Sequence, residues 1–158
     1  MTRENLKLTR ETASELLESI PPERIEKIEN ERSFPHPDEV LTMAEKYKKP
    51  DLCNYYCANQ CPIGQEYVPE VKIKDLSQIV LEMLASLNAM NKRKDRLIEI
   101  TAVGKISDDE LEDFLYIQEE LERISITVET LQLWAEKMLA TGVIDEARYE
   151  AYRSRKKT

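Results

Sequence analysis

The amino-acid sequence predicts an all-α protein, and three observations lead to that fold class. Only three glycines occur in 158 residues, too few for the tight turns of a many-stranded sheet. Apolar residues recur at steps of three and four along most of the chain, which is the spacing of a helix face. Prolines and glycines interrupt this spacing at intervals, as they do between consecutive helices. The length suits one globular domain or two small helical units.

The first third of the chain is expected to fold into short helices. Thr9 is placed to cap the first helix, and Glu18 and Ser19 form the turn that follows it. Pro22 fits the first turn of the next helix, where the missing N–H costs little and the fixed φ helps initiation. The helices expected in this region cover residues 9–17, 23–31, 38–47 and 51–60.

Two longer helices and one short helix are expected in the remainder. The first long helix runs from Lys74 to about Ile100, and Gly104 breaks the pattern after it. Ser107 and Glu110 have the spacing of a capping box, so the second long helix is expected to begin at Ser107. A short helix follows over residues 145–152. The expected apolar seams are Leu76, Val80, Met83, Leu87, Met90 and Leu97, and Leu111, Phe114, Leu121, Val128, Leu131 and Ala135, the second widened by Ile117, Ile124 and Met138.

The predicted domain organisation has three parts. Residues 1–64 form the short-helix domain, residues 65–73 form a linker, and residues 74–158 form a long antiparallel helical hairpin with a short terminal helix. The apolar stripe of the hairpin is wider than a single partner helix requires. The further surface could be the amino-terminal domain, the last helix or a second copy of the hairpin. We expect a homodimer through residues 74–140, in which coiled-coil-like seams form a four-helix core.

Charge and composition limit the class of function. A net charge of −8 disfavours non-specific binding of polyanions by the whole molecule, although a local basic site is still allowed. No apolar run approaches the roughly 18 to 20 residues of a membrane span. Three crowded cysteines suit a reducing compartment, so a cytoplasmic protein is expected. No recognisable hydrolase or phosphate-loop motif is present, and we therefore expect neither an enzyme nor a cofactor.

The three cysteines are candidate metal ligands. Cys53, Cys57 and Cys61 recur every four residues, so a continuous helix would place their thiols near one stripe. Tetrahedral zinc would need a fourth ligand, and His36 is the only histidine. The spacing differs from the close cysteine pairs of zinc ribbons, and free cysteines are commonly buried as small apolar groups. We expect no metal site.

Residues 6–49 resemble the phage repressor and Cro-type helix-turn-helix domain, also called the xenobiotic-response-element family. The resemblance lies in small apolar residues, an Ile-Glu-Lys-Ile-Glu run and two prolines, namely Leu8, Thr9, Ala13, Leu16, Leu17, Ile25, Glu26, Lys27, Ile28, Glu29, Pro35, Pro37, Val40, Leu41 and Ala44. The family's first helix is truncated here, because only residues 3–6 match its end.

The resemblance implies a DNA-binding regulator of transcription. In that family the segment matching residues 9–17 crosses the DNA backbone, and the segment matching residues 22–31 enters the major groove of double-stranded DNA. The carboxyl-terminal hairpin would then serve dimerisation or binding of a partner. By resemblance, the residues at or beside the DNA-contacting positions are Arg10, Arg24, Lys27, Asn30 and Arg32.

Two alternative functions follow from other features of the sequence. Carboxylates outnumber basic residues in the helix-turn-helix segment, which favours a protein–protein interaction module built on a degenerate helix-turn-helix without DNA binding. The cysteines suggest a metal- or redox-responsive regulator as a third possibility.

Overall fold

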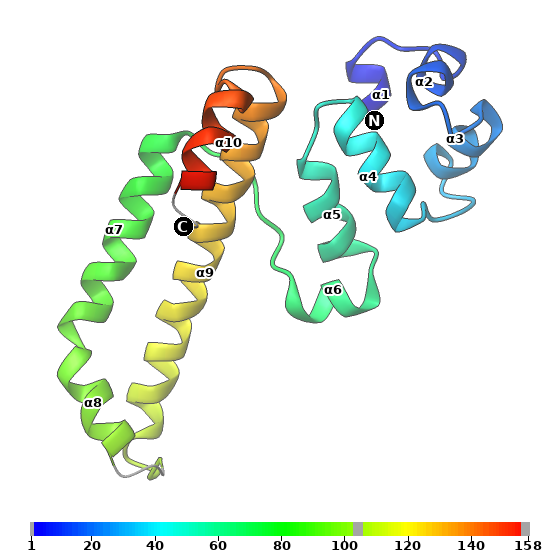
Figure 1. Cartoon of the computed structure of the whole chain (residues 1–158). Coiled ribbons are helices and arrows are strands. Elements are labelled where there is room, and N and C mark those ends of the chain that lie inside the picture. Colours follow the sequence, from blue (N-terminus) through cyan, green and yellow to red (C-terminus); the bar gives the residue numbers. More distant parts are fainter. Residues whose placement is uncertain (1, 103–105, 156–158) are drawn as a thin grey trace. The chain divides into compact units, whose positions relative to one another are not determined.

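The computed structural model describes residues 2–102 and 106–155. Within these residues it contains helices and no strand, which confirms the all-α prediction (Figure 1). The expected break at Gly104 lies outside the described residues. The chain separates into two compact units. The amino-terminal unit comprises Met1–Val71 and Ala135–Thr158, and the hairpin unit comprises Lys72–Trp134.

The amino-terminal unit contains α1 to α6, the last turns of α9, and α10. Its short helices are α1 (Thr2–Asn5), α2 (Arg10–Leu17), α3 (Pro22–Glu29), α4 (Pro37–Lys46), α5 (Asp51–Asn59), α6 (Pro62–Tyr67) and α10 (Glu146–Arg155). The four predicted short helices and the terminal helix match α2 to α5 and α10 within a few residues. The unit boundaries differ from residues 1–64, 65–73 and 74–158, because α9 (Leu111–Ala140) continues unbroken from the hairpin unit into the amino-terminal unit.

Local chemistry fixes the ends of α2 and α3. The backbone N–H of Thr12 donates to the Thr9 hydroxyl over 3.1 Å, so Thr9 caps α2 as expected. Pro22 occupies the first turn of α3. The two helices pack through a buried core whose members are Ala13, Leu17, Ile20, Ile25 and Tyr47. This core holds α3 against α2.

Helix α6 was missed in the sequence because its six residues include a glycine. Gly64 is buried, and a Cβ at this position would overlap the backbone carbonyl of Cys57 on α5. The absent side chain therefore allows two helix backbones to approach closely.

Gly64→Ala is expected to destabilise the amino-terminal unit by about 2 kcal/mol, since the overlap involves backbone atoms and helix α6 must shift outward. Thermal unfolding followed by circular dichroism measures the effect. Glu66→Ala, at an exposed neighbouring position of the same helix, is the control. An unchanged melting temperature for Gly64→Ala would contradict this close packing.

The hairpin unit differs from the prediction of one continuous first helix. The chain forms α7 (Leu76–Lys92) and α8 (Lys94–Ala102), and they run antiparallel to α9 (Figure 1). At the break, Arg93 donates to Asp113 over 2.6 Å and lies 4.4 Å from the Tyr116 ring centroid. Arg96 donates to the same carboxylate over 2.7 Å. These contacts lie about twenty residues away in the sequence, so local spacing does not indicate the break.

The predicted start of the second long helix at Ser107 was also wrong. Regular helix begins at Leu111. The Ser107 backbone N–H does donate to the Glu110 carboxylate over 3.0 Å, which is one half of the expected capping box. This contact closes a tight turn before the helix.

The buried surface of α9 lies beside the predicted seam. Leu111, Leu121 and Val128 are between 41% and 51% exposed, whereas polar residues are buried together with Ile117. Those polar residues are satisfied locally: the Thr127 and Thr130 hydroxyls donate to backbone carbonyls one turn earlier, and Glu120 accepts from Arg123 over 2.7 Å. These hydrogen bonds lower the free-energy cost of burying polar side chains. The spacing of the apolar residues alone therefore predicted the buried side of α9 incorrectly. On α7 the buried residues are Ile79 and Ser86.

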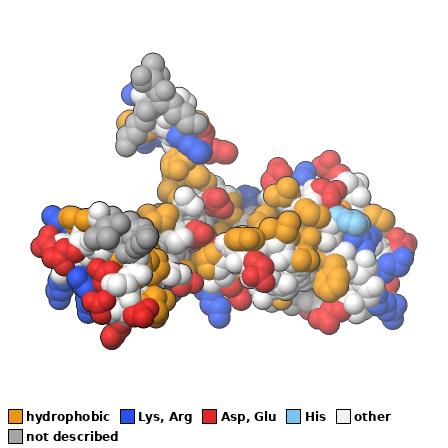
Figure 2. Space-filling model, turned by 90° about the horizontal axis from the view of Figure 1, so that it is seen from below, with side chains coloured by type: hydrophobic (Ala, Val, Ile, Leu, Met, Phe, Trp, Pro, Cys, Tyr) orange, Lys and Arg blue, Asp and Glu red, His pale blue; other side chains and the backbone are white. Residues whose placement is uncertain are grey.

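No helix among the described residues has both the length and the apolar character needed to cross a membrane. The face in Figure 2 carries hydrophobic areas among acidic and basic side chains. In the amino-terminal unit, the most exposed large apolar side chains are Phe34, Ile63, Tyr67 and Val143, each more than 70% exposed.

Candidate nucleic-acid interface

The candidate interface is built on α3 and the turn that follows it. Ile25 of α3 is 2% exposed and fixes the inner side of the helix in the core. Lys27, Asn30 and Arg32 are exposed at its carboxyl end. Neither Lys27 nor Arg32 forms a side-chain ion pair with the part of the chain that the structure describes. These three predicted site residues are therefore accessible to a ligand.

The backbone after α3 positions Arg32. Glu31 has a φ of 56°, in the left-handed region, and the Arg32 N–H donates to the Lys27 carbonyl over 2.9 Å. This is the hydrogen bond of a Schellman helix end, where glycine is most common. The turn brings Arg32 back toward the last turn of α3, so that Lys27 and Arg32 lie at the same end of the helix.

Arg24 forms hydrogen bonds within the protein that its position in the sequence did not predict. Its guanidinium donates to both carboxylate oxygens of Glu39 over 2.7 Å, to the Ser33 hydroxyl over 2.6 Å and to the Phe34 carbonyl over 2.9 Å. Its side chain is only 18% exposed. Arg24 thus ties α3 to the start of α4 and orients the loop between them.

Arg10 is also engaged within the protein. Its Nε donates to Glu29 over 2.9 Å, and Arg3 donates to both oxygens of the same carboxylate. Glu29 is 9% exposed, while the Arg10 side chain keeps 35% of its surface exposed. The hydrogen bond from Arg3 lowers the pKa of Glu29 most, and Arg10 lowers it further. Glu29 therefore anchors the last turn of α3 to α1 and α2.

The surface surrounding α3 is acidic. Glu11 and Glu15 of α2 and Glu23 of α3 are exposed, and Glu31 is exposed directly after the helix. Lys27 and Arg32 form a small cationic area within these carboxylates. An approaching polyanion would be attracted only over a short distance, because salt screens charges beyond about 10 Å.

Acid is expected to destabilise the amino-terminal unit through two carboxylates. The pKa of Glu29 is lowered chiefly by Arg3, and the pKa of Glu39 is lowered chiefly by Arg24. A carboxyl group with a depressed folded-state pKa contributes stability that is present above its unfolded pKa and is lost as the pH falls through the folded value. The melting temperature should therefore decline below about pH 4.3, the ordinary pKa of glutamate.

Melting curves between pH 7 and pH 3 measure this effect. The double variant Glu29→Gln/Glu39→Gln should start from a lower melting temperature and decline less with acid. The control Glu23→Gln changes an exposed carboxyl of α3 and should follow the wild-type profile. If the melting temperature of the wild type and of the double variant declined identically with acid, Glu29 and Glu39 would not be the cause of the acid instability.

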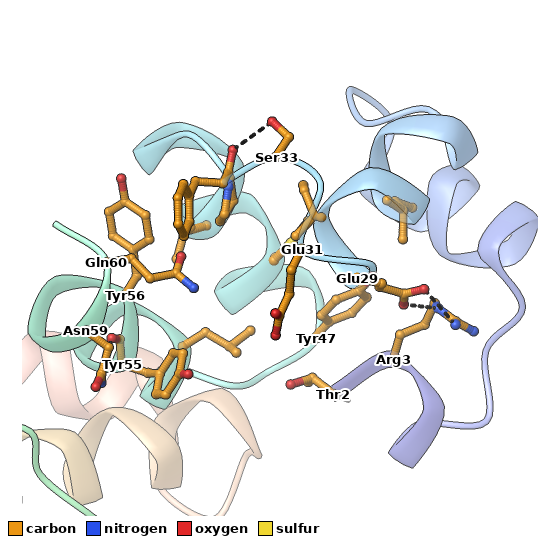
Figure 3. A pocket seen from close by; sticks show the side chains of 17 residues that line it. Thr2, Arg3, Glu29, Glu31, Ser33, Tyr47, Tyr55, Tyr56, Asn59 and Gln60 are labelled. Carbon is orange, nitrogen blue, oxygen red and sulfur yellow. Dashed lines mark hydrogen bonds and ion pairs between the residues drawn. The ribbon is translucent and has the colours of Figure 1, made fainter.

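A cleft of about 640 Å³ lies in the same unit, beside the end of α3. Its lining combines apolar side chains from α3, α4 and α5 with polar groups from α5. Figure 3 shows the Glu31 side chain directed into this cleft, with Tyr55, Tyr56 and Gln60 on its other side. The pattern of the sequence did not indicate this cleft, because its lining comes from residues up to about sixty positions apart.

The four candidate metal ligands do not come together. Cys53 and Cys57 lie on α5, but Cys61 lies beyond the end of that helix and caps α6. Burial raises the pKa of the Cys53 thiol, with smaller contributions from Cys57 and Glu136. His36 caps α4, where its backbone N–H donates to Glu39 over 2.7 Å. No group of three or more His, Cys, Asp or Glu side chains able to hold a metal ion occurs in residues 2–102 and 106–155.

Comparisons with known proteins give no relative for this chain: no family model, curated protein or solved structure matches it.

Proposed function

We propose that the protein is a DNA-binding regulator whose α2 and α3 form a helix-turn-helix, with α3 as the reading helix. The observation that carries the proposal is the presentation of α3. Its inner side is fixed by Ile25 and Glu29, while Lys27, Asn30 and Arg32 stay exposed at one end. A helix held in place on one side, with cationic and amide side chains exposed at its carboxyl end, can present those side chains to a duplex.

The accessible residues suit different parts of a duplex. Lys27 and Arg32 supply positive charge for phosphates, which fixes register but carries no sequence information. Asn30 supplies a side-chain amide of the kind that pairs with adenine in the major groove. Its contact with Glu26 is long, at 3.4 Å, and is therefore easily exchanged for a base.

Arg10 and Arg24 were predicted to contact DNA, and their ion pairs within the protein lead us to propose other roles for them. Arg24 is enclosed by Glu39 and its loop, so it acts as a positioning residue for α3. Arg10 retains an exposed part of its guanidinium and adds charge beside the reading helix while it binds Glu29. The proposed contacts to DNA are thus Lys27, Asn30 and Arg32, with Arg10 in support.

Selection of genomic DNA tests the proposal. The purified full-length protein is incubated with fragmented DNA of its source organism in low salt, and the retained fragments are sequenced. Enrichment of a shared sequence supports the proposal. Retention of no fragments above a blank matrix, with a folded protein, would refute it.

A second candidate function is favoured by the acidic surface around α3. Arg10 and Arg24 are bound to carboxylates of the protein itself, and the cleft beside α3 exposes Phe34 and Tyr55. These features suit a protein partner that carries basic and apolar side chains. Under this alternative the selection experiment recovers no DNA, and charge-reversal at Glu23 or Glu31 weakens binding to the protein partner.

A further inference from the structure

The cleft beside α3 has the size and the lining of a small-molecule site. Its volume of about 640 Å³ lies within the range of roughly 300 to 1,000 Å³ that is usual for ligand pockets. All of its lining residues belong to the amino-terminal unit, and they come from α1, α3, α4 and α5 and the turns beside these helices. Ile25 and Tyr47 are members of the buried core, and Met43 and Leu52 pack against that core. Packed helices therefore hold the apolar lining in place.

The cleft carries one carboxylate that the protein does not neutralise. Its charged lining residues are Arg3, Glu29 and Glu31. Arg3 donates to both carboxylate oxygens of Glu29, and Arg10 donates to the same group over 2.9 Å. The Glu31 carboxylate forms no ion pair or hydrogen bond within residues 2–102 and 106–155. Figure 3 shows this side chain directed into the cleft. The charge left for a ligand is therefore negative.

Aromatic rings lie across the cleft from this carboxylate. Tyr55 and Tyr56 of α5 face Glu31 from the other side (Figure 3). Phe34 also lines the cleft and is 74% exposed. The faces of aromatic rings attract cations, and tyrosine hydroxyls can accept a hydrogen bond from an ammonium group. The cleft thus offers a carboxylate on one side and aromatic rings on the other.

We propose that this cleft binds a small organic cation, in which an ammonium group is joined to an apolar or aromatic body. The ammonium pairs with Glu31, and the body contacts Ile28 and Met43. An anion would meet the Glu31 carboxylate, while Arg3 is already bound to Glu29. A neutral apolar ligand would remove water from that carboxylate without replacing it by a partner, which costs free energy.

This inference goes beyond the proposed function, and it is tested in the absence of DNA. The exposed residues proposed to contact DNA, Lys27, Asn30 and Arg32, do not line the cleft. Failure to bind an organic cation is therefore distinguished from failure to bind DNA.

Isothermal titration calorimetry of the full-length protein with tryptamine and with tryptophol tests the proposal. The two probes share an indole body and an ethyl chain, and they differ in carrying an ammonium or a hydroxyl group. The wild type should bind tryptamine roughly fivefold more tightly than tryptophol or better, because only tryptamine pairs with Glu31. Equal affinity for the two probes, or no binding of tryptamine at concentrations of about 5 mM, overturns the proposal.

A variant of the carboxylate tests its role directly. Glu31→Gln keeps the size of the side chain and removes the charge, so its affinity for tryptamine should fall to that for tryptophol. Its affinity for tryptophol should stay unchanged. Glu45→Gln is the matched control, because Glu45 is an exposed carboxylate of α4 that does not line the cleft. It should bind both probes like the wild type. A folded Glu31→Gln with unchanged affinity for tryptamine overturns the proposal.

Two measurements on the unaltered protein avoid dependence on a variant that fails to fold. In methyl NMR spectra, tryptamine should shift the signals of Ile28, Met43 and Leu52, which line the cleft. Shifts confined to methyl groups outside the lining contradict the site. A protein partner could present the same chemistry through a lysine side chain, so a short peptide with one lysine between leucines is titrated as well. It should bind more weakly than tryptamine, and tighter binding of the peptide overturns the assignment to a small molecule.

Discussion

Replacing Lys27 and Arg32 together with alanine is expected to weaken DNA binding by roughly 30-fold or more without changing the melting temperature. Both side chains are exposed and neither is used in an ion pair among the described residues, so their removal costs the fold little. Each contact to phosphate releases about one counterion. The slope of log affinity against log salt concentration should therefore fall by about 2.

Fluorescence anisotropy on a fragment recovered from the genomic selection measures this loss. The matched control is Lys72→Ala, which removes an exposed lysine from the segment before α7. It should leave affinity and salt slope nearly unchanged. Equal losses in Lys72→Ala and in the double variant would indicate a general charge effect, and DNA affinity unchanged in the double variant would exclude α3 as the contact surface.

The largest stability effect is expected for Ile25→Ala. Ile25 is 2% exposed and packs in the core with Leu17 and Ile20, which hold α2 against α3. Truncation leaves a cavity between two short helices, at a cost of about 3 kcal/mol. In a unit of this size, each kcal/mol lowers the melting temperature by roughly 4 to 8 °C. Binding to DNA should be lost at temperatures above the lowered transition.

Chemical denaturation with urea measures the free energy of unfolding of Ile25→Ala and of its control. Ile63→Ala provides the matched control, because it makes the same truncation in the same unit at a side chain that is 72% exposed. Its free energy of unfolding should change by less than about 1 kcal/mol. Equal effects of the two truncations would contradict the assigned core.

Two helix starts that local chemistry determines were predicted correctly. The cap at Thr9 and the first-turn proline at Pro22 set the starts of α2 and α3, and both signals lie within a few residues of the helix ends they define. The break at Arg93 was missed because its partners are Asp113 and Tyr116 on another helix. Helix α6 was missed because its stability depends on contact of Gly64 with α5.

Among the site residues too, features set by local sequence were predicted and features set by tertiary contacts were not. Exposure of Lys27 and Arg32 follows from their positions away from the apolar side of α3, which the spacing of the sequence predicts. The engagement of Arg24 with Glu39 and of Arg10 with Glu29 depends on tertiary placement. The spacing of residues predicts which charged side chains lie away from the core. It does not predict which carboxylate the tertiary fold places beside each of them.

The most direct measurement of the central claim is a salt titration of the full-length protein on its enriched DNA fragment. We expect binding whose log affinity falls linearly with log salt concentration, with a shallower slope for the Lys27→Ala/Arg32→Ala variant. A folded wild-type protein that binds no fragment at low salt, or binds with the same slope as the double variant, would contradict it.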